Sequence, residues 1–270
     1  MRGQSRVLIL AMLLGAVAVQ PAQAQETWQQ AYRASARAVE GGDTKAALRM
    51  AREAASMYLI MERPVKPDAY VHLVLTAADL AQQVGRTGVA LADIRYALGK
   101  LDGDDRANWA AKAYLYRAMG DLQVGADGPA ARDAYVSYLS ASQQAYGQTD
   151  PRVAMAYLSL VELELRLNDV ATARQYQQQA EAIVRPALGW SDITRVRVEL
   201  LGARVDTASG KVVAAEQRYN QLLDVKRPAD GEAAVLWQAA GQDYLALLRQ
   251  QGRVAEADAL AARLSAGGML

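Results

Sequence analysis

The side chains that most often carry catalysis are scarce in this sequence. His72 is the only histidine, and the chain has no cysteine. A nucleophilic triad with a histidine base would have to include His72, and a structural zinc site has too few nitrogen and sulfur ligands. His72 lies in the middle of a helical pattern, where a structural or exposed role is expected. We predict no catalytic residue, no metal site and no cofactor.

The carboxylate pairs do not change this interpretation. Asp104 and Asp105 lie in an expected loop, and Glu162 and Glu164 are two residues apart on a helix, so their side chains point apart. Neither pair resembles the facing carboxylates of a glycosidase. The segment 85–88 lacks the glycine spacing of a phosphate-binding loop. We predict that the chain is not an enzyme.

Charge argues against a further class of protein, and composition favours one class of fold. The sequence has 30 basic and 29 acidic residues, so it lacks the basic excess of a general nucleic-acid-binding protein. Hydrophobic residues make up 52% of the chain, yet there is no Phe. A core must then be built from Ala, Leu, Val and Tyr, and the small and straight-chain members of this set favour closely packed helices.

Helical periodicity dominates from residue 26 onward. The segments 70–83 and 153–167 place apolar residues at positions i, i+3, i+4 and i+7. Residues that accept a left-handed backbone interrupt the helices every 40 to 43 residues. An alanine follows five residues after every interruption. The interruptions are Gly42, Gly85, Gly125, Asn168, Gly210 and Gly252, and the alanines are Ala47, Ala90, Ala130, Ala173, Ala215 and Ala257.

This regularity predicts helix–turn–helix units. A small side chain at a fixed distance from a turn is needed where two helices approach closely. The loops between the units contain Pro, Gly and Asp. Asp68, Asp150 and Asp230 stand where an N-cap for the next helix is expected.

The spacing of glycine and alanine resembles the tetratricopeptide repeat. The segments 41–54 and 168–180 are similar to its turn and second helix, and 145–189 is the best match to a whole unit. The period is that of the long-repeat variety found in kinesin light chains. The resemblance covers residues 27–264 and implies an all-α, right-handed α-solenoid of about six hairpins. We expect this domain to span 25–270. A HEAT-like array and an irregular helical bundle remain as alternatives.

The resemblance also implies a binding surface. In this family the first helix of each hairpin lines a concave groove that holds a protein or peptide. The family's inner positions, carried onto this sequence, select Tyr32, His72, Asp79, Lys112, Met119, Leu158, Glu162, Arg166, Arg197, Arg204 and Arg249.

Two kinds of side chain stand out in this set. Leu and Met in the middle of the groove suit adaptable packing against a partner, although they are also explained as core between hairpins. The arginines toward the far end match carboxylates, which suggests an acidic segment of the partner. Alternatively, these arginines are solvated or paired within the chain.

The N-terminus has the three parts of a secretory signal. Arg2 and Arg6 precede the apolar run 7–19, and the small-x-small pattern at 22–24 predicts cleavage before Gln25. The run is shorter than the ~20 residues that span a bilayer, though a membrane anchor is the alternative. We expect an exported bacterial protein without a membrane segment after cleavage. In a bacterium with two membranes it would reside in the periplasm.

Three functions are consistent with these patterns. The first is an interaction scaffold of the cell envelope that binds a protein partner in its groove. The second is an accessory protein of a peptidoglycan enzyme, or a helical enzyme of that kind. The third is a self-associating subunit, because 233–264 ends the array without an obviously polar cap.

Overall fold

The computed structural model describes residues 27–189, 192–224 and 231–266, and every regular element in these ranges is a helix. The predicted signal, residues 1–24, lies outside the described residues. The helices are α2 (Trp28–Glu40), α3 (Thr44–Met61), α4 (Pro67–Gln83), α5 (Thr87–Leu98), α6 (Arg106–Gln123), α7 (Gly128–Tyr146), α8 (Pro151–Arg166), α9 (Val170–Ala187), α10 (Ile193–Ala208), α11 (Val212–Leu223), α12 (Gly231–Gln250) and α13 (Val254–Ala266).

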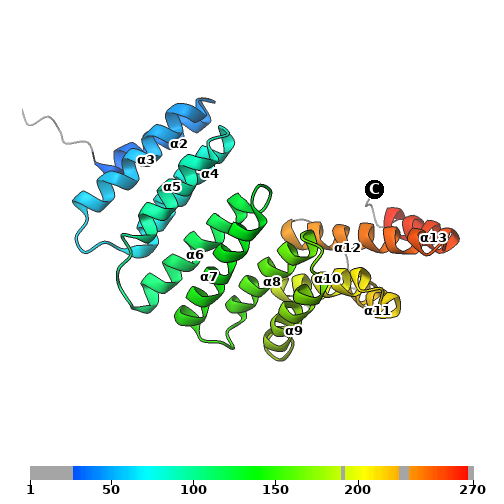
Figure 1. The fold of residues 1–270 in the computed structure, drawn as a ribbon. Helices are drawn as coiled ribbons and strands as arrows, with labels where there is room; N and C mark the ends of the chain where they lie inside the picture. The colour runs from blue at the N-terminus through cyan, green and yellow to red at the C-terminus, as the bar shows by residue number, and fades with distance from the viewer. Residues whose placement is uncertain (1–26, 190–191, 225–230, 267–270) are drawn as a thin grey trace, which may run out of the picture. The chain divides into compact units, whose positions relative to one another are not determined.

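Consecutive helices pair as six hairpins in the described residues, and this confirms the predicted all-α solenoid class (Figure 1). The chain divides into two compact units, one ending at Lys66 and the other beginning at Pro67. The first unit contains the hairpin α2–α3. Inside this hairpin the Trp28 ring meets Tyr58 edge-on, with ring centroids 5.1 Å apart, and the Ser35 hydroxyl donates to the Ala47 carbonyl at 2.8 Å.

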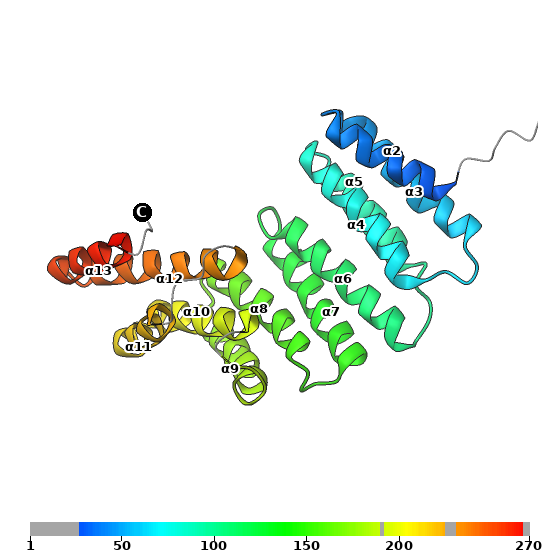
Figure 2. The same cartoon turned by 180° about the vertical axis from the view of Figure 1, so that it is seen from behind.

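The second unit contains the other five hairpins, in chain order (Figure 2). Each second helix packs against the first helix of the next hairpin, as α5 does on α6 and α9 on α10. First helices also contact one another, as α4 contacts α6, α8 contacts α10, and α10 contacts α12. This arrangement brings side chains of successive first helices together, and the candidate site lies there.

Five of the six predicted interruptions have the expected turn. Gly42, Gly85, Gly210 and Gly252 have φ between 70° and 77°, and Asn168 has φ 59°. After each, the next backbone N–H donates to a carbonyl five residues earlier, as Asp169 does to Glu164 at 2.9 Å. This bond is the Schellman closure, which satisfies a carbonyl at the end of a helix.

The third hairpin departs from this pattern. Gly125 is absent from the residues with positive φ, and α7 begins after Asp127, two residues beyond Gly125 instead of one. The extra residue moves the helix forward, so the fully buried alanine is Ala131, and Ala130 is only half-buried. The prediction of Ala130 is therefore wrong by one residue. The other five alanines of the set are fully buried as expected.

The predicted N-caps are partly confirmed. Asp150 caps α8, and its side chain accepts from the Arg152 N–H at 2.9 Å. Asp68 lies inside the first turn of α4, because Pro67 already begins that helix. Asp230 is outside the described residues. Asp105 and Asp192 cap α6 and α10, which the sequence analysis did not predict.

Buried charges join α10 to both of its neighbours along the chain, α9 and α11, beside the apolar contacts there. The carboxylate of Glu199 on α10 has no exposed surface, and it meets Arg195 at 3.0 Å and Arg218 of α11 at 2.5 Å. Arg218 also reaches Asp206 at 3.1 Å. Gly202 leaves room for this, since a Cβ there would lie 2.8 Å from the Arg218 guanidinium. Arg185 of α9 reaches the Glu199 carboxylate at 3.3 Å, so the network ties α10 to both α9 and α11.

Candidate functional site

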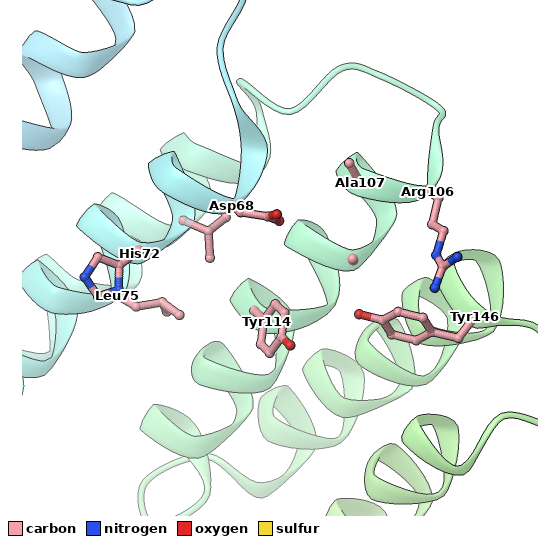
Figure 3. Close-up of a pocket in the computed structure, with 9 residues that line it drawn as sticks. Asp68, His72, Leu75, Arg106, Ala107, Tyr114 and Tyr146 are labelled. Atoms are coloured by element: carbon pink, nitrogen blue, oxygen red, sulfur yellow. The ribbon is translucent and has the colours of Figure 1, made fainter.

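A pocket of about 650 Å³ lies between the first helices α4 and α6, with one wall from the end of α7 (Figure 3). Its volume is in the range of ligand pockets. All of its residues belong to the second unit. They are Asp68, Val71, His72, Leu75, Arg106, Ala107, Ala110, Tyr114 and Tyr146.

Two of the residues that line this pocket are tyrosines, Tyr114 and Tyr146. Tyr114 is 53% exposed, although α6 packs against α4, α5 and α7. In Figure 3, Tyr114 lies between the side chains of α4 and the Tyr146 ring. Burial raises the pKa of Tyr146, and its neighbour Tyr114 raises it further. The Tyr146 ring is therefore neutral at pH 7, and both tyrosines present an aromatic face with a polar tip.

Two arginines lie over the Tyr146 ring. The Arg152 guanidinium is 3.7 Å from the ring centroid, and that of Arg106 is 5.7 Å from it. Arg152 also holds both carboxylate oxygens of Asp150, at 2.8 and 2.7 Å. These hydrogen bonds lower the pKa of Asp150 to about 2. Arg106 forms no ion pair within 4 Å among the described residues, and its charge also contributes to the lowered pKa of Asp150.

A second cleft, of about 450 Å³, lies between the first helices α8 and α10. It is lined by Glu162, Leu165, Arg166, Leu201 and Arg204. The Arg204 Nε donates to Asp243 Oδ2 of α12 at 2.7 Å. Arg197, about two turns earlier on α10, is paired with Glu232. The alternative that the arginines are paired within the chain therefore holds for Arg197 and Arg204.

The structure brings together only part of the predicted set. His72 lines the α4–α6 pocket, and Glu162, Arg166 and Arg204 line the α8–α10 cleft. Tyr32 belongs to α2 of the first unit. Exposed Asp79, half-buried Met119 and exposed Arg249 lie on α4, α6 and α12 but line neither cavity.

Two predicted residues have other roles. Leu158 is 3% exposed and packs in the core with Val161 and Val184. This position of α8 faces the neighbouring helices, so the assignment of Leu158 to a binding surface is wrong. Lys112 turns back toward the preceding loop, where its ammonium donates to the Gly103 carbonyl at 3.3 Å and lies 4.3 Å from the Trp109 ring centroid.

The sequence analysis missed the residues that line the pocket on α6. Arg106, Ala110 and Tyr114 follow one another at intervals of four, so they form one stripe of the helix. Lys112 is the first position that the carried-over set selects on α6, so Arg106 and Ala110, which precede it, were not considered. A search for four-residue stripes within each first helix would have found the set.

Other kinds of site were sought in the same residues. No cluster of three His, Asp or Glu side chains that could hold a metal ion occurs among the residues described. Within the described ranges, no helix is both long and apolar enough to cross a membrane.

Comparison with solved structures identifies the fold. The crystal structure of BtubC (BKLC) from P. vanneervenii matches with a TM-score of 0.69 and 17% identity, over 90% of this chain and 91% of that one. A tetratricopeptide repeat protein from Parabacteroides merdae ATCC 43184 matches with a TM-score of 0.58 and 17% identity, over 89% of this chain and 79% of that one. The fold is that of a tetratricopeptide-like repeat.

No protein-family model matches the sequence, and no curated protein is significantly similar to it. The likeness therefore concerns architecture. In a tetratricopeptide-like hairpin the first helix is the one whose side chains face the first helices of neighbouring units. Both cavities described above lie between such helices, α4 with α6 and α8 with α10.

Proposed function

We propose that the protein is a tetratricopeptide-like scaffold that binds a segment of a partner protein on the first helices of its second unit. The observation that carries this proposal is the α4–α6 pocket with its exposed Tyr114. An aromatic side chain contributes binding free energy mainly through the apolar surface that it buries. A ring left open in a concave site is the kind of residue that anchors a partner.

We infer that the two cavities bind different kinds of side chain of the same partner segment. The α4–α6 pocket offers aromatic and aliphatic walls from Tyr114, Tyr146 and Leu75, with Arg106 at its side. The α8–α10 cleft offers Arg166 and Arg204 beside Glu162. An apolar side chain of the partner enters the first, and acidic residues of the same segment meet the arginines of the second.

The proposal assigns no reaction to the chain. His72 is the only histidine of the sequence, and the polar groups around it in the pocket are tyrosines, Asp68 and Arg106.

We propose further that the protein acts in the cell envelope after export. This localisation is supported by the three-part signal pattern of residues 1–24, which has a basic start, an apolar run and a small-x-small cleavage pattern.

A matched pair of tyrosine variants tests the site. Tyr114 and Tyr96 are both exposed on helices, by 53% and 59%, but Tyr96 lies on the second helix α5, outside both cavities. We expect Tyr114→Ala to weaken partner binding by roughly tenfold or more, as for an aromatic anchor, and Tyr96→Ala to leave it unchanged. Partners are first captured from the native envelope with the wild-type protein and then titrated calorimetrically against each variant.

Two outcomes would count against the site. If both variants bind the captured partner with wild-type affinity, the partner uses another surface. If both lose affinity equally while their thermal unfolding is unchanged, the contact is not specific to first helices.

A further inference from the structure

We infer that Glu232 and Asp243 of α12 act as built-in competitors for the arginines of α10, so that the protein admits only partners whose acidic residues displace them. This inference rests on the proposed function and deepens it. It concerns the pairs Arg197–Glu232 and Arg204–Asp243, which both run from α10 to α12.

The geometry shows that each arginine already holds a carboxylate. Arg204 Nε meets Asp243 Oδ2 at 2.7 Å, the distance of a charge-assisted hydrogen bond. Arg197 meets a carboxylate oxygen of Glu232. The two sites therefore accept the same chemical group that an acidic partner would bring, and the chain supplies that group itself.

The exposure of these pairs makes them exchangeable. The side chains are 30% and 48% exposed in the first pair and 37% and 31% in the second. By contrast, the Glu199 carboxylate that binds Arg218 on another face of α10 has no exposed surface. Exposed ion pairs are weak because water screens both charges. A partner's carboxylate can replace them without dismantling the joint between the helices.

The charge of the region supports the same interpretation. Arg166, Arg197 and Arg204 are matched by Glu162, Glu232 and Asp243, so the surface is neutral as it stands. Arg166 has no ion pair with any residue that the structure describes. A neutral surface does not attract anions from a distance. Selection of an acidic partner then requires contact, when it exchanges its carboxylates for those of α12.

The spacing of the arginines indicates the partner's form. Arg197 and Arg204 are seven residues apart on one helix, which places their Cα atoms about 10 Å apart. Acidic residues three apart in an extended segment span about the same distance. We therefore expect the partner to present an extended acidic segment with a carboxylate at every third residue.

Charge-removing variants test the inference with a defined probe. The probe is a fluorescein-labelled peptide with Glu at every third position and Ala between, and its Gln counterpart is the uncharged reference. Glu232→Gln with Asp243→Asn frees both arginines and keeps the side-chain shapes. We expect this double variant to bind the acidic peptide about five- to tenfold more tightly than wild type in fluorescence anisotropy at low salt.

The control is a double variant on α13 that removes the same two negative charges away from the arginines of α10. Glu256 and Asp258 are exposed on α13, and Glu256 is also paired with an arginine, Arg253, at 2.6 Å. Glu256→Gln with Asp258→Asn should change the affinity by less than about twofold. Adding Arg197→Gln and Arg204→Gln to the freed variant should remove its gain.

The outcomes separate this inference from the proposed function. An equal gain in the control variant, or no gain in the freed variant, would overturn the competitor role and leave the Tyr114 test standing. A gain in the freed variant combined with partner binding that ignores Tyr114→Ala would support the competitor role and contradict the pocket. Thermal unfolding of each variant confirms that the comparison is made between folded proteins.

Discussion

At the scale of single residues, buried alanines decide how closely the helices of each hairpin approach. Every hairpin of the described chain has a fully buried alanine four residues after the residue that immediately precedes its second helix, as Ala131 follows Asp127. Its N–H donates to the carbonyl of that residue, as Ala173 does to Asp169 at 3.0 Å. The small side chain and the first helical hydrogen bond therefore belong to one local pattern.

Neighbouring alanines test this pattern in the third hairpin. Ala131→Leu should destabilise the protein by about 1–3 kcal/mol, because a larger side chain would have to enter a filled core. Ala130→Leu should cost much less, since Ala130 is half-buried. Urea unfolding of the two variants measures the difference. Equal loss of stability would show that the register of α7 is wrong.

Buried tyrosines predict how the protein responds to alkali. Burial raises the pKa of Tyr219 to about 12, and burial also raises the pKa values of Tyr70 and Tyr135. Because the folded pKa of Tyr219 lies above its unfolded value near 10, its stabilising contribution is complete below pH 10 and is lost as pH rises toward 12. Absorbance at 295 nm should show a group of tyrosines that ionises only as the protein unfolds.

The alkaline prediction has an internal control. The helical circular dichroism signal, followed in the same titration, shows the pH at which the protein unfolds. A single ionisation step for all tyrosines, complete before any loss of helical signal, would contradict the burial of Tyr219.

At the scale of elements, the contacts of α10 with α9 and α11 include buried charges beside apolar side chains. Glu199 and Arg218 are held in a network that also includes Asp206 and Arg195. Buried charges contribute little net stability when all are paired, but the loss of one partner leaves another charge without compensation. The position of α10, and with it of Arg197 and Arg204, depends on the completeness of this network.

Neutralising Glu199 tests that dependence. Glu199→Gln should lower the free energy of unfolding by about 3–5 kcal/mol, because Arg218 and Arg195 lose a buried counter-charge. Glu256→Gln removes a carboxylate that is 60% exposed and paired with Arg253, and it should leave the urea midpoint unchanged. Similar midpoints for the two variants would mean that the network is not buried in solution.

At the scale of the whole molecule, the sequence predicted the class of fold and the number of hairpins, because each hairpin repeats the same turn and the same buried alanine. It did not predict the pocket on α6. The predicted groove positions on α6 begin at Lys112, and the pocket uses Arg106 and Ala110, which lie nearer the start of that helix. The pairing of Arg197 and Arg204 was left open, because a contact between α10 and α12 depends on how hairpins stack.

Export is a prediction about the whole molecule as well. The pattern of residues 1–24 predicts that the exported protein begins at Gln25. Removal of the segment takes away Arg2 and Arg6, so 28 basic and 29 acidic residues remain. N-terminal sequencing of the protein recovered from outside the cytoplasm checks this. Detection of Met1 or Arg2 on that material would favour a retained membrane anchor.

The turn between α6 and α7 has a practical consequence for protein engineering. It already contains one residue more than the other turns between paired helices, and Gly125, Ala126 and Asp127 are all exposed. The hairpin absorbs the additional length without losing its buried alanine, Ala131. Exposed turns of this kind are where insertions are best tolerated. A short tag or a cysteine for a fluorophore, placed after Gly125, would report on partner binding from outside both cavities.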